Sequence, residues 1–288
     1  MKVLSFGEIL WDIYPNGKYI GGAPLNFAAH FAKQGGDTYI ISAVGNDDLG
    51  KSALEIIRNW GIKTDYISVL NTSETGKCLI KLDSKGLPSY NLLDNVAYDH
   101  ITEPASFDTD FDALYFGTLA LRNPKNRETL LRIISNNSFK EIFVDINIRK
   151  PFVSEEAIKI SFENATIVKI SDEELYCVTK LLFNSEFDYA QSSKVIGNTY
   201  KNIKFVIITL GEKGSFVYDC RNEIEYFCKA EKVKVASTVG AGDSFSATFL
   251  NQYFRGNTIN KCLKSASRVS AYVVSKTEAV PEYEYNKL

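Results

Sequence analysis

The stretch that decides the fold is STVGAGDSFSATFL, residues 237–250. It follows a strand-like run at residues 232–236, and Phe245, Phe249 and Leu250 then recur at helical spacing among small residues. This pattern predicts a strand that turns sharply into a helix. Repeated units of that kind build a parallel sheet, so the rest of the chain should show the same alternation.

The glycines of this turn predict a helix start that binds an anion. Gly240 and Gly242 let the backbone approach a ligand closely, and the amides of Ala241, Gly242 and Asp243 would point outward from the helix N-terminus. Asp243 is unusual there, because a carboxylate repels a phosphate unless it has a chemical task. Alternatively, Asp243 or Ser244 simply caps the helix. The turn alone leaves both interpretations open.

The composition is that of an ordinary globular protein, with 288 residues, 45% hydrophobic, 24% charged and a net charge of −2. This charge gives no electrostatic reason to expect nucleic acid or an anionic membrane as a partner. Five scattered cysteines without a CxxC spacing indicate reduced thiols, and two distant histidines, His30 and His100, disfavour a histidine metal site. With no signal peptide and no long apolar run, we expect a cytoplasmic protein.

Strand and helix patterns alternate along most of the chain. This alternation predicts an α/β fold with a mostly parallel sheet covered by helices on both faces. Strands are expected at 3–9, 38–44, 113–117, 141–147, 165–170 and 205–210, a hairpin at 214–227, and helices at 21–33, 48–60, 126–135, 154–162, 172–182 and 260–274. Ligands bind at the carboxyl ends of such strands, where Asp12, Asn147, Thr209 and Asp243 are expected to share one cleft.

Residues 75–101 break the alternation. GKCLIKLD and PSYNLL, separated by a turn at residues 84–86, predict a hairpin without an accompanying helix. Residues 17–20 could add a strand to it. We expect one domain over residues 1–288, with a small sheet from about 13–20 and 75–103 that stands off the main body.

Residues 45–52, GNDDLGKS, match the phosphate-loop pattern G-x-x-x-x-G-K-[ST]. Taken alone, they would predict a nucleoside triphosphatase with Asp145 as its magnesium ligand. The two aspartates inside the loop would oppose the charge of a phosphate, and no glycine lies between the end residues. We therefore favour a surface turn in which Asp47 or Asp48 caps a helix.

Two motifs, GGAPLN at 21–26 and TVGAGD at 238–243, have the order and separation found in the ribokinase-type (PfkB) sugar kinases, which this chain resembles over its whole length. The resemblance implies the three-layer ribokinase-like fold with a small β-sheet lid. It also implies that Asp243 accepts the proton of the attacking sugar hydroxyl and that the amides of residues 240–243 bind the transferring phosphoryl group. In that family, residues 45–52 are an ordinary turn.

For the sugar, the resemblance implies three residues that can bond hydroxyl groups: Asp12, Gly22 and Asn26. The family also has a D-x-N-x-R run, here DINIR at 145–149. In an extended chain Asp145, Asn147 and Arg149 would face one side. Arg149 is assigned to the phosphates or the substrate, with Asn147 beside it. Alternatively, Arg149 forms a structural ion pair.

The resemblance implies five nucleotide-binding residues: Lys169, Ser171, Thr209, Gly211 and Gly214. Glu174 would organise Mg²⁺ through water, with Ser171 in place of the Asn that many members carry three residues before it. Alternatively, the acidic residues at 172–174 only favour a helix start. ATP with Mg²⁺ and a small sugar are the partners that follow from the family.

GEILWD, GGAP, PSY and VAYDHI are most similar to the fructokinase branch, and Leu10 replaces a sugar-binding Asn of ribokinases. The expected activity is ATP-dependent phosphorylation of D-fructose to fructose 6-phosphate. Kinases for 2-keto-3-deoxygluconate or ribose, a hydrolase built on residues 45–52 and a non-catalytic sugar sensor are the alternatives. Ser237 and Glu278 depart from the family pattern, which leaves activation by K⁺ open. The small sheet would close over the sugar and could form a homodimer contact.

Overall fold

The computed structural model describes residues 1–82 and 88–288, and the turn expected at 84–86 lies outside them. A nine-stranded sheet has the order β13-β12-β11-β10-β9-β8-β1-β4-β5, parallel from β11 to β5 and antiparallel at β12 and β13. Its strands are β1 (Lys2–Phe6), β4 (Asp37–Gly45), β5 (Ile67–Leu70), β8 (Ala113–Gly117), β9 (Glu141–Asp145), β10 (Ile167–Ser171), β11 (Phe205–Thr209), β12 (Ser215–Asp219) and β13 (Ile224–Cys228).

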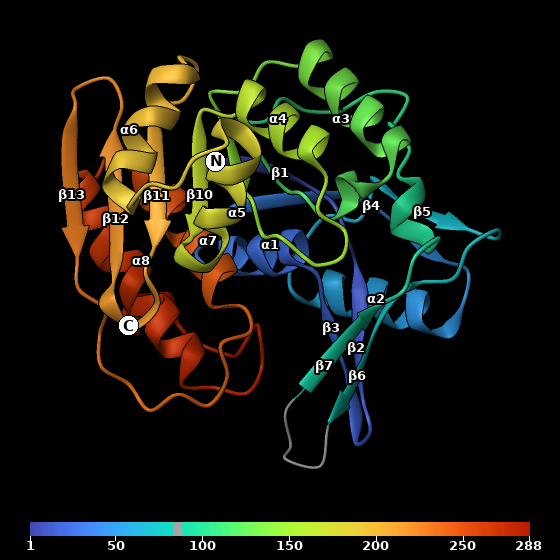
Figure 1. Cartoon of the computed structure of the whole chain (residues 1–288). Helices are drawn as coiled ribbons and strands as arrows, with labels where there is room; N and C mark the ends of the chain where they lie inside the picture. The colour runs from blue at the N-terminus through green and yellow to red at the C-terminus, as the bar shows by residue number, and fades with distance from the viewer. Residues whose placement is uncertain (83–87) are drawn as a thin grey trace.

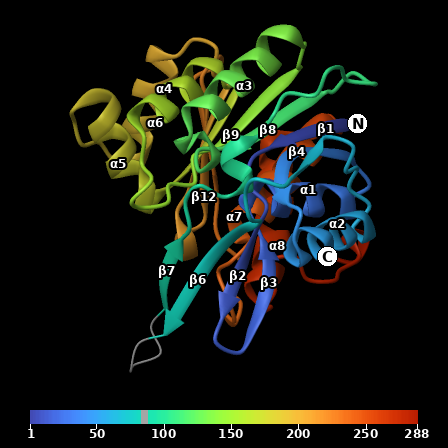
Figure 2. The same cartoon turned by 90° about the vertical axis from the view of Figure 1, so that its right-hand side faces the viewer.

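Helices cover both faces of this sheet, as Figures 1 and 2 show. One face carries α1 (Ala23–Lys33), α2 (Asp48–Asn59), α7 (Ala241–Phe254) and α8 (Ile259–Val274), and the other carries α3 (Pro124–Asn136), α4 (Glu155–Asn164), α5 (Asp172–Phe183) and α6 (Tyr189–Thr199). Each face buries its own apolar side chains, such as Phe27, Tyr115 and Phe249 on the first and Leu130 and Phe162 on the second. The predicted three-layer α/β fold is confirmed.

A second sheet of four strands, in the order β3-β2-β6-β7, stands off the body (Figure 1). Its strands are β2 (Leu10–Tyr14), β3 (Gly17–Gly21), β6 (Gly76–Leu82) and β7 (Pro88–Leu92). Residues 93–103 add no strand to it. The run expected as one strand at 3–9 ends at Phe6, and the chain passes within a few residues into β2. Asp12 therefore lies inside a strand of the small sheet, which corrects its expected position at the end of a body strand.

Two further expectations of extended backbone are wrong. Residues 232–236 form no strand, and their valines, Val233 and Val235, are 40% and 61% exposed, so the alternation of Lys and Val faces no core. Instead, the amides of Ala236 and Ser237 donate to the carbonyl of Val274 at the end of α8. Residues 145–149 are not extended either, because β9 ends at Asp145 and Asn147 has a left-handed φ of 44°.

Helix α7 lies between α1 and α8 against the sheet, and its first turn is directed toward the side of the body that bears the small sheet (Figures 1 and 2). Small residues make this burial possible, because Ser244, Ser246, Ala247 and Thr248 are all buried along it. Such side chains let neighbouring helices approach closely without a wide apolar stripe. The sequence pattern of 237–250 thus predicts the helix correctly, although the segment before it is irregular.

Candidate active site

The start of α7 offers free backbone donors. Gly240 has a left-handed φ of 79°, and no side chain caps the helix. Ala241 N donates to Thr238 O at 3.3 Å, whereas the amides of Gly242 and Asp243 have no acceptor within the described residues. Neither capping alternative holds, because Ser244 Oγ donates to the carbonyl of Ala241 instead. Unpaired amides at a helix N-terminus attract an anion.

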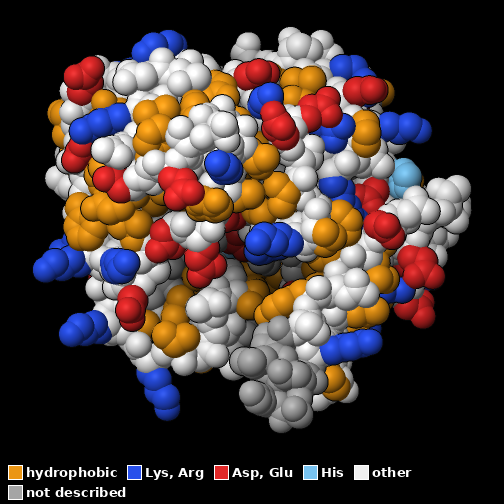
Figure 3. Space-filling view, viewed as in Figure 1, with side chains coloured by type: hydrophobic (Ala, Val, Ile, Leu, Met, Phe, Trp, Pro, Cys, Tyr) orange, Lys and Arg blue, Asp and Glu red, His pale blue; other side chains and the backbone are white. Residues whose placement is uncertain are grey.

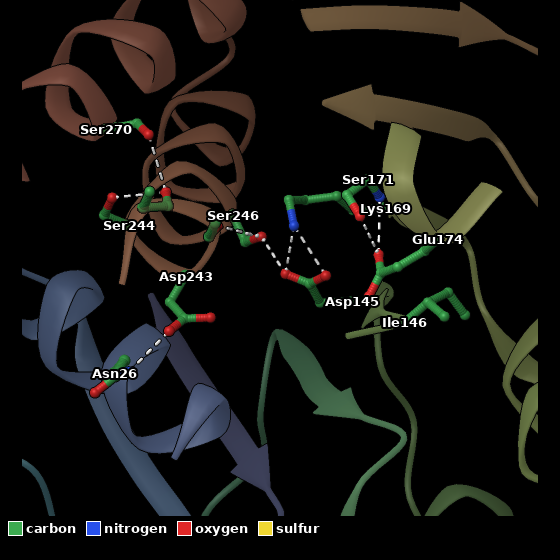
Figure 4. Close-up of polar contacts among 12 residues, drawn as sticks. Asn26, Asp145, Ile146, Lys169, Ser171, Glu174, Asp243, Ser244, Ser246 and Ser270 are labelled. Carbon is green, nitrogen blue, oxygen red and sulfur yellow. Dashed lines mark hydrogen bonds and ion pairs between the residues drawn. The ribbon is translucent and has the colours of Figure 1, made fainter. Parts of the chain in front are cut away.

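The carboxylate of Asp243 turns away from these amides and meets α1. Asn26 Nδ2 donates to Asp243 Oδ2 at 2.8 Å (Figure 4). Burial raises the pKa of Asp243 to about 6, and the negative charge of Asp145 adds to the shift, while the bond from Asn26 opposes it. Asn26 is buried and its Oδ1 has no partner among the described residues. The pair therefore has one carboxylate oxygen and one amide oxygen left for a hydroxyl-bearing ligand.

Gly22 explains how α1 brings Asn26 to this point. It precedes the helix with φ 118°, and a Cβ there would lie 2.3 Å from the carbonyl oxygen of Glu8. Only glycine fits a backbone that turns this way against another chain segment. The GGAPLN motif thus starts α1 directly over the connection between β1 and β2.

Glu8, in that connection, is a site residue that the sequence interpretation missed. Its side chain is 2% exposed, Oε1 accepts from Ala23 N at 3.2 Å, and Oε2 has no partner within the described part of the chain. Burial raises the pKa of Glu8 to about 7. The positive charge of Arg149 acts against the raised pKa of Glu8, Asp12 and Asp243 alike, although Arg149 is exposed and forms no ion pair with another described residue. In the sequence, the one indication of such a role was that Glu8 is the single charged residue in the apolar run VLSFGEI.

A buried ion pair lies beneath the helix start. Lys169 Nζ donates to both oxygens of Asp145 at 2.9 and 2.7 Å, and Ser246 Oγ of α7 donates to Asp145 Oδ2 at 3.0 Å (Figure 4). Although burial disfavours its charge, Asp145 raises the pKa of Lys169. A Cβ on Gly242 would lie 3.1 Å from Lys169 Nζ, so the ammonium group touches the amide-bearing turn from below. Asp145 therefore faces Lys169 and α7, and shares no extended face with Asn147.

Glu174 joins two loops of the site. Its Oε2 accepts from the amide and hydroxyl of Ser171 at 2.9 and 2.8 Å (Figure 4). Its Oε1 accepts from Ile148 N at 2.6 Å. The residues described contain no group of three His, Cys, Asp or Glu side chains that could hold a metal. Ser171 and Glu174 form the capping box that opens α5, so the expected helix-start role is present, and a water-mediated contact of Glu174 with Mg²⁺ stays a prediction.

The predicted nucleotide loop borders a hollow between β13 and α8. Thr209 ends β11, and a Cβ on Gly214 would lie 2.0 Å from the carbonyl of Cys228, which lines the hollow. The hollow has a volume of about 380 Å³ and includes Ser267. One turn further along α8, Ser270 Oγ donates to Ala241 O at 3.0 Å. The loop, the hollow and the start of α7 are thus neighbours, and Gly211 opens the short 3₁₀ turn Gly211–Lys213 between Thr209 and Gly214.

Residues 45–52 also border a hollow, of about 250 Å³ and lined by Asn46 and Asp47, but here the aspartate occupies the local donors itself. Asp47 Oδ1 accepts from Gly50 N at 2.8 Å and from Thr75 Oγ1 at 2.7 Å, and Oδ2 accepts from Thr75 N at 2.8 Å. Lys51 is exposed at the surface, 4.0 Å from Asp48. The predicted cap on α2 is confirmed, with Asp47 in that role.

The surface is hollowed where the small sheet meets the body, and side chains of both charges surround the opening (Figure 3). Within residues 1–82 and 88–288, no helix has the length and apolarity needed to cross a bilayer.

Fold and site together define the class: an α/β kinase that acts on a small molecule. The family model for "pfkB family carbohydrate kinase" matches residues 15–284, and the chain belongs to this family. It is 25% identical to probable fructokinase-3 of Arabidopsis thaliana over 97% of this chain and 87% of that one.

Solved structures of similar fold include an uncharacterized sugar kinase from Pyrococcus horikoshii in complex with ATP, at 27% identity and a TM-score of 0.80, covering 99% of this chain and 96% of that chain. A fructokinase from Vibrio cholerae, bound to fructose, ADP and a calcium ion, has a TM-score of 0.82 at 23% identity, covering 97% of this chain and 94% of that chain. The chain is therefore a carbohydrate kinase, as its two motifs predict.

Proposed function

We propose that this carbohydrate kinase transfers the γ-phosphoryl group of ATP to D-fructose and forms fructose 6-phosphate. The observation that carries the proposal is the Asn26–Asp243 pair beside the free amides of Gly242 and Asp243. A proton acceptor next to an anion site is what phosphoryl transfer to an alcohol requires. The fructokinases among its relatives support fructose as the sugar.

Asp243 acts as the general base. With a pKa of about 6 it is ionised at neutral pH, yet basic enough to take a proton from a hydroxyl as the phosphoryl group arrives. The sugar oxygen forms a bond to the γ-phosphorus, the bond from that phosphorus to the β,γ-bridging oxygen breaks, and the hydroxyl proton goes to Asp243. Asn26 Nδ2 fixes one carboxylate oxygen and leaves the other for the substrate.

The anion site stabilises the phosphoryl group during transfer. The amides of Gly242 and Asp243 donate to its oxygens, with Ala241 at the edge of the turn, and Gly240 sets their direction. Arg149, whose charge lowers the pKa of Asp243 against the effect of burial, adds positive charge for the phosphates. Asn147, whose left-handed φ of 44° turns the loop, orients Arg149.

The nucleotide extends from the start of α7 along α8. We place the nucleoside in the hollow of about 380 Å³, with the loop of Thr209, Gly211 and Gly214 at its border. Ser171 and Glu174 fix the loop beside the phosphates. Lys169, held by Asp145, packs beneath Gly242 and supports the turn that binds the phosphates. Mg²⁺, when bound with ATP, supplies charge that neutralises the phosphates.

The sugar is bound between the small sheet and the body. Asp12 lies on β2 of the small sheet, whereas Gly22 and Asn26 begin α1 of the body. Carboxylate and amide oxygens accept hydrogen bonds from hydroxyl groups. Asn26 donates to Asp243 through Nδ2, so its Oδ1 remains as an acceptor for the sugar. Closure of the small sheet over the sugar would exclude water, which competes as a nucleophile.

A sugar panel tests this proposal. The purified protein is mixed with ATP, Mg²⁺ and one sugar at a time, and ADP release is followed. We expect the highest kcat/KM with D-fructose. A higher value with ribose or 2-keto-3-deoxygluconate would keep the kinase and replace the sugar. Tight sugar binding without ADP release would instead indicate a sensor, and the proposed function would be lost.

A further inference from the structure

His30 is completely buried on α1, one turn after Asn26. Its Nε2 lies 2.9 Å from the carbonyl oxygen of Ala279, and its Nδ1 lies 2.8 Å from the hydroxyl of Tyr283. A carbonyl oxygen only accepts, so Nε2 carries the proton, and Nδ1 accepts from the tyrosine hydroxyl. Burial lowers the pKa of His30 to about 4, so the ring is neutral at physiological pH. Both nitrogens are thus committed to residues that follow α8.

The carbonyl held by His30 presses on the first residue of the anion site. A Cβ on Gly240 would lie 2.3 Å from Ala279 O, which means that this oxygen packs directly against the Gly240 backbone. On the other side of the turn, Val274 O accepts from the amides of Ala236 and Ser237. The turn that opens α7 is therefore held at two points, by the last residue of α8 and by Ala279 in the segment that follows α8.

That segment has little regular structure of its own. Residues 275–284 form no helix or strand in the structure. They are tied down by side chains, including the bond of His30 to Tyr283, the ion pair of Lys33 with Glu282 at 2.8 Å, and the bond of Tyr272 OH to Glu282 O at 2.9 Å. An irregular segment keeps a fixed position only through such contacts. Of these, only the His30 ring reaches Ala279 itself.

We propose that His30 is a positioning residue for phosphoryl transfer, which fixes the amides of Gly242 and Asp243 by holding Ala279 O against Gly240. The inference rests on the proposed anion site. Asn26 and His30 are four residues apart and share one face of α1. This face of α1 thus orients the carboxylate of Asp243 through Asn26 and positions the amides of the anion site through His30. Small displacements of such a site cost much of the rate.

Two substitutions of His30 test this role. His30→Phe keeps a planar aromatic ring and removes both hydrogen bonds, and we expect kcat to fall about tenfold or more with the sugar KM changed less than about threefold. In His30→Gln, the side-chain amide can donate to Ala279 O, and we expect most of kcat to return. Lys33→Ala is the matched control, because it releases Glu282 of the same segment but leaves Ala279 held; its kcat should equal that of the wild type.

Binding of a transition-state mimic gives a second readout. By calorimetry, His30→Phe should bind ADP as the wild type does, but bind ADP with aluminium fluoride and sugar more weakly by about the same factor as kcat falls. If His30→Phe does not fold, Tyr283→Phe is the alternative. It removes the hydroxyl that donates to Nδ1 and so keeps the proton on Nε2 toward Ala279 O, and it should lower kcat a few-fold at constant KM.

An unchanged kcat in folded His30→Phe, or equal losses in the Phe and Gln variants, would overturn the inference. With an unfolded Phe variant, unchanged kcat in Tyr283→Phe would overturn it. A wild-type protein that phosphorylates no sugar would refute the proposed function instead, so the two failures are distinguishable.

Discussion

Two helix starts in this protein have similar glycine- and aspartate-containing sequences, but only one of them leaves its backbone amides free. At residues 45–52 and at 238–244, glycines and an aspartate lead into a helix. At α2, Asp47 folds back and takes the amide of Gly50 and two donors of Thr75. At α7 no side chain caps the helix. A glycine-rich turn can bind a phosphate only when its own side chains leave the amides free.

The two aspartates differ electrostatically as well. Burial opposes ionisation of both. The bonds from Thr75 and Gly50 outweigh it and lower the pKa of Asp47, whereas burial and the charge of Asp145 raise the pKa of Asp243 to about 6. A carboxylate with satisfied oxygens is a structural cap, and a carboxylate with a raised pKa is suited to move a proton.

The largest expected effect is at the carboxylate of α7. Asp243→Asn keeps the shape of the side chain and removes the proton acceptor, so kcat/KM should fall about 10²-fold or more. Steady-state assays with the best sugar would measure it. Activity within about threefold of the wild type would refute Asp243 as the base.

A substitution at Gly240 tests the geometry of the open helix start. Gly240→Ala adds a Cβ at a φ of 79° and 2.3 Å from Ala279 O, so the turn must shift. We expect kcat to fall about tenfold or more and the melting temperature to drop. A variant with native kcat would show that the direction of these amides is unimportant.

The pH profile follows from the raised pKa of Asp243. Since the base must be ionised, kcat/KM should fall about tenfold per pH unit below about pH 6. The stability effect has the opposite sign. The folded protein holds this proton more tightly than the unfolded chain, so ionisation costs folding free energy that is absent below the unfolded pKa and complete above about pH 6. Asp243→Asn should therefore melt higher than the wild type at pH 7.5 and lose that advantage near pH 4. An acid limb that persists in the residual activity of Asp243→Asn would exclude Asp243 as its source.

At α2 the expected effects concern stability. Asp47→Ala removes the helix cap and the bonds to Thr75, and we expect a loss of about 1–2 kcal/mol in the free energy of unfolding. The kcat should stay within about twofold of the wild type, because Asp47 lies outside the proposed active site. Urea denaturation and the same kinetic assay measure the two quantities. A large loss of kcat in the folded variant would reopen residues 45–52 as a site.

The smallest effect is expected at Lys51. Its side chain is exposed at 70% and lies 4.0 Å from Asp48, so Lys51→Ala should change neither kcat nor stability by a measurable amount. In a phosphate loop the same lysine would be essential. The ratio of the Asp243 and Lys51 effects therefore measures the difference between the two helix starts directly.

The alternation of strands and helices was predictable because each buried strand leaves a continuous apolar run, such as ALYFG at 113–117. The ends of α1 and α2 were predictable from glycines and caps. Missed elements were β5 and α6, whose short or polar sequences carry a weak signal.

Features set by distant partners were not predictable from local pattern. Whether Asp145 faces a ligand or Lys169 depends on a contact between two strands, and the sequence shows neither. Glu8 and His30 read as an odd charge in a strand and a polar residue in a helix. Their meaning lies in contacts with Ala23 and with Ala279, at sequence separations of 15 and 249 residues.

The short connection from β1 to β2 puts Asp12 on the small sheet, whereas Asn26 lies on α1 and Asp243 on α7, two helices that cover the large sheet. The two sheets share no strand among the described residues. A sugar that is hydrogen-bonded to both Asp12 and Asn26 would therefore link the small sheet to the body noncovalently. The bound sugar would then help to hold the small sheet against the body, and release of the product would remove this link until the next sugar binds.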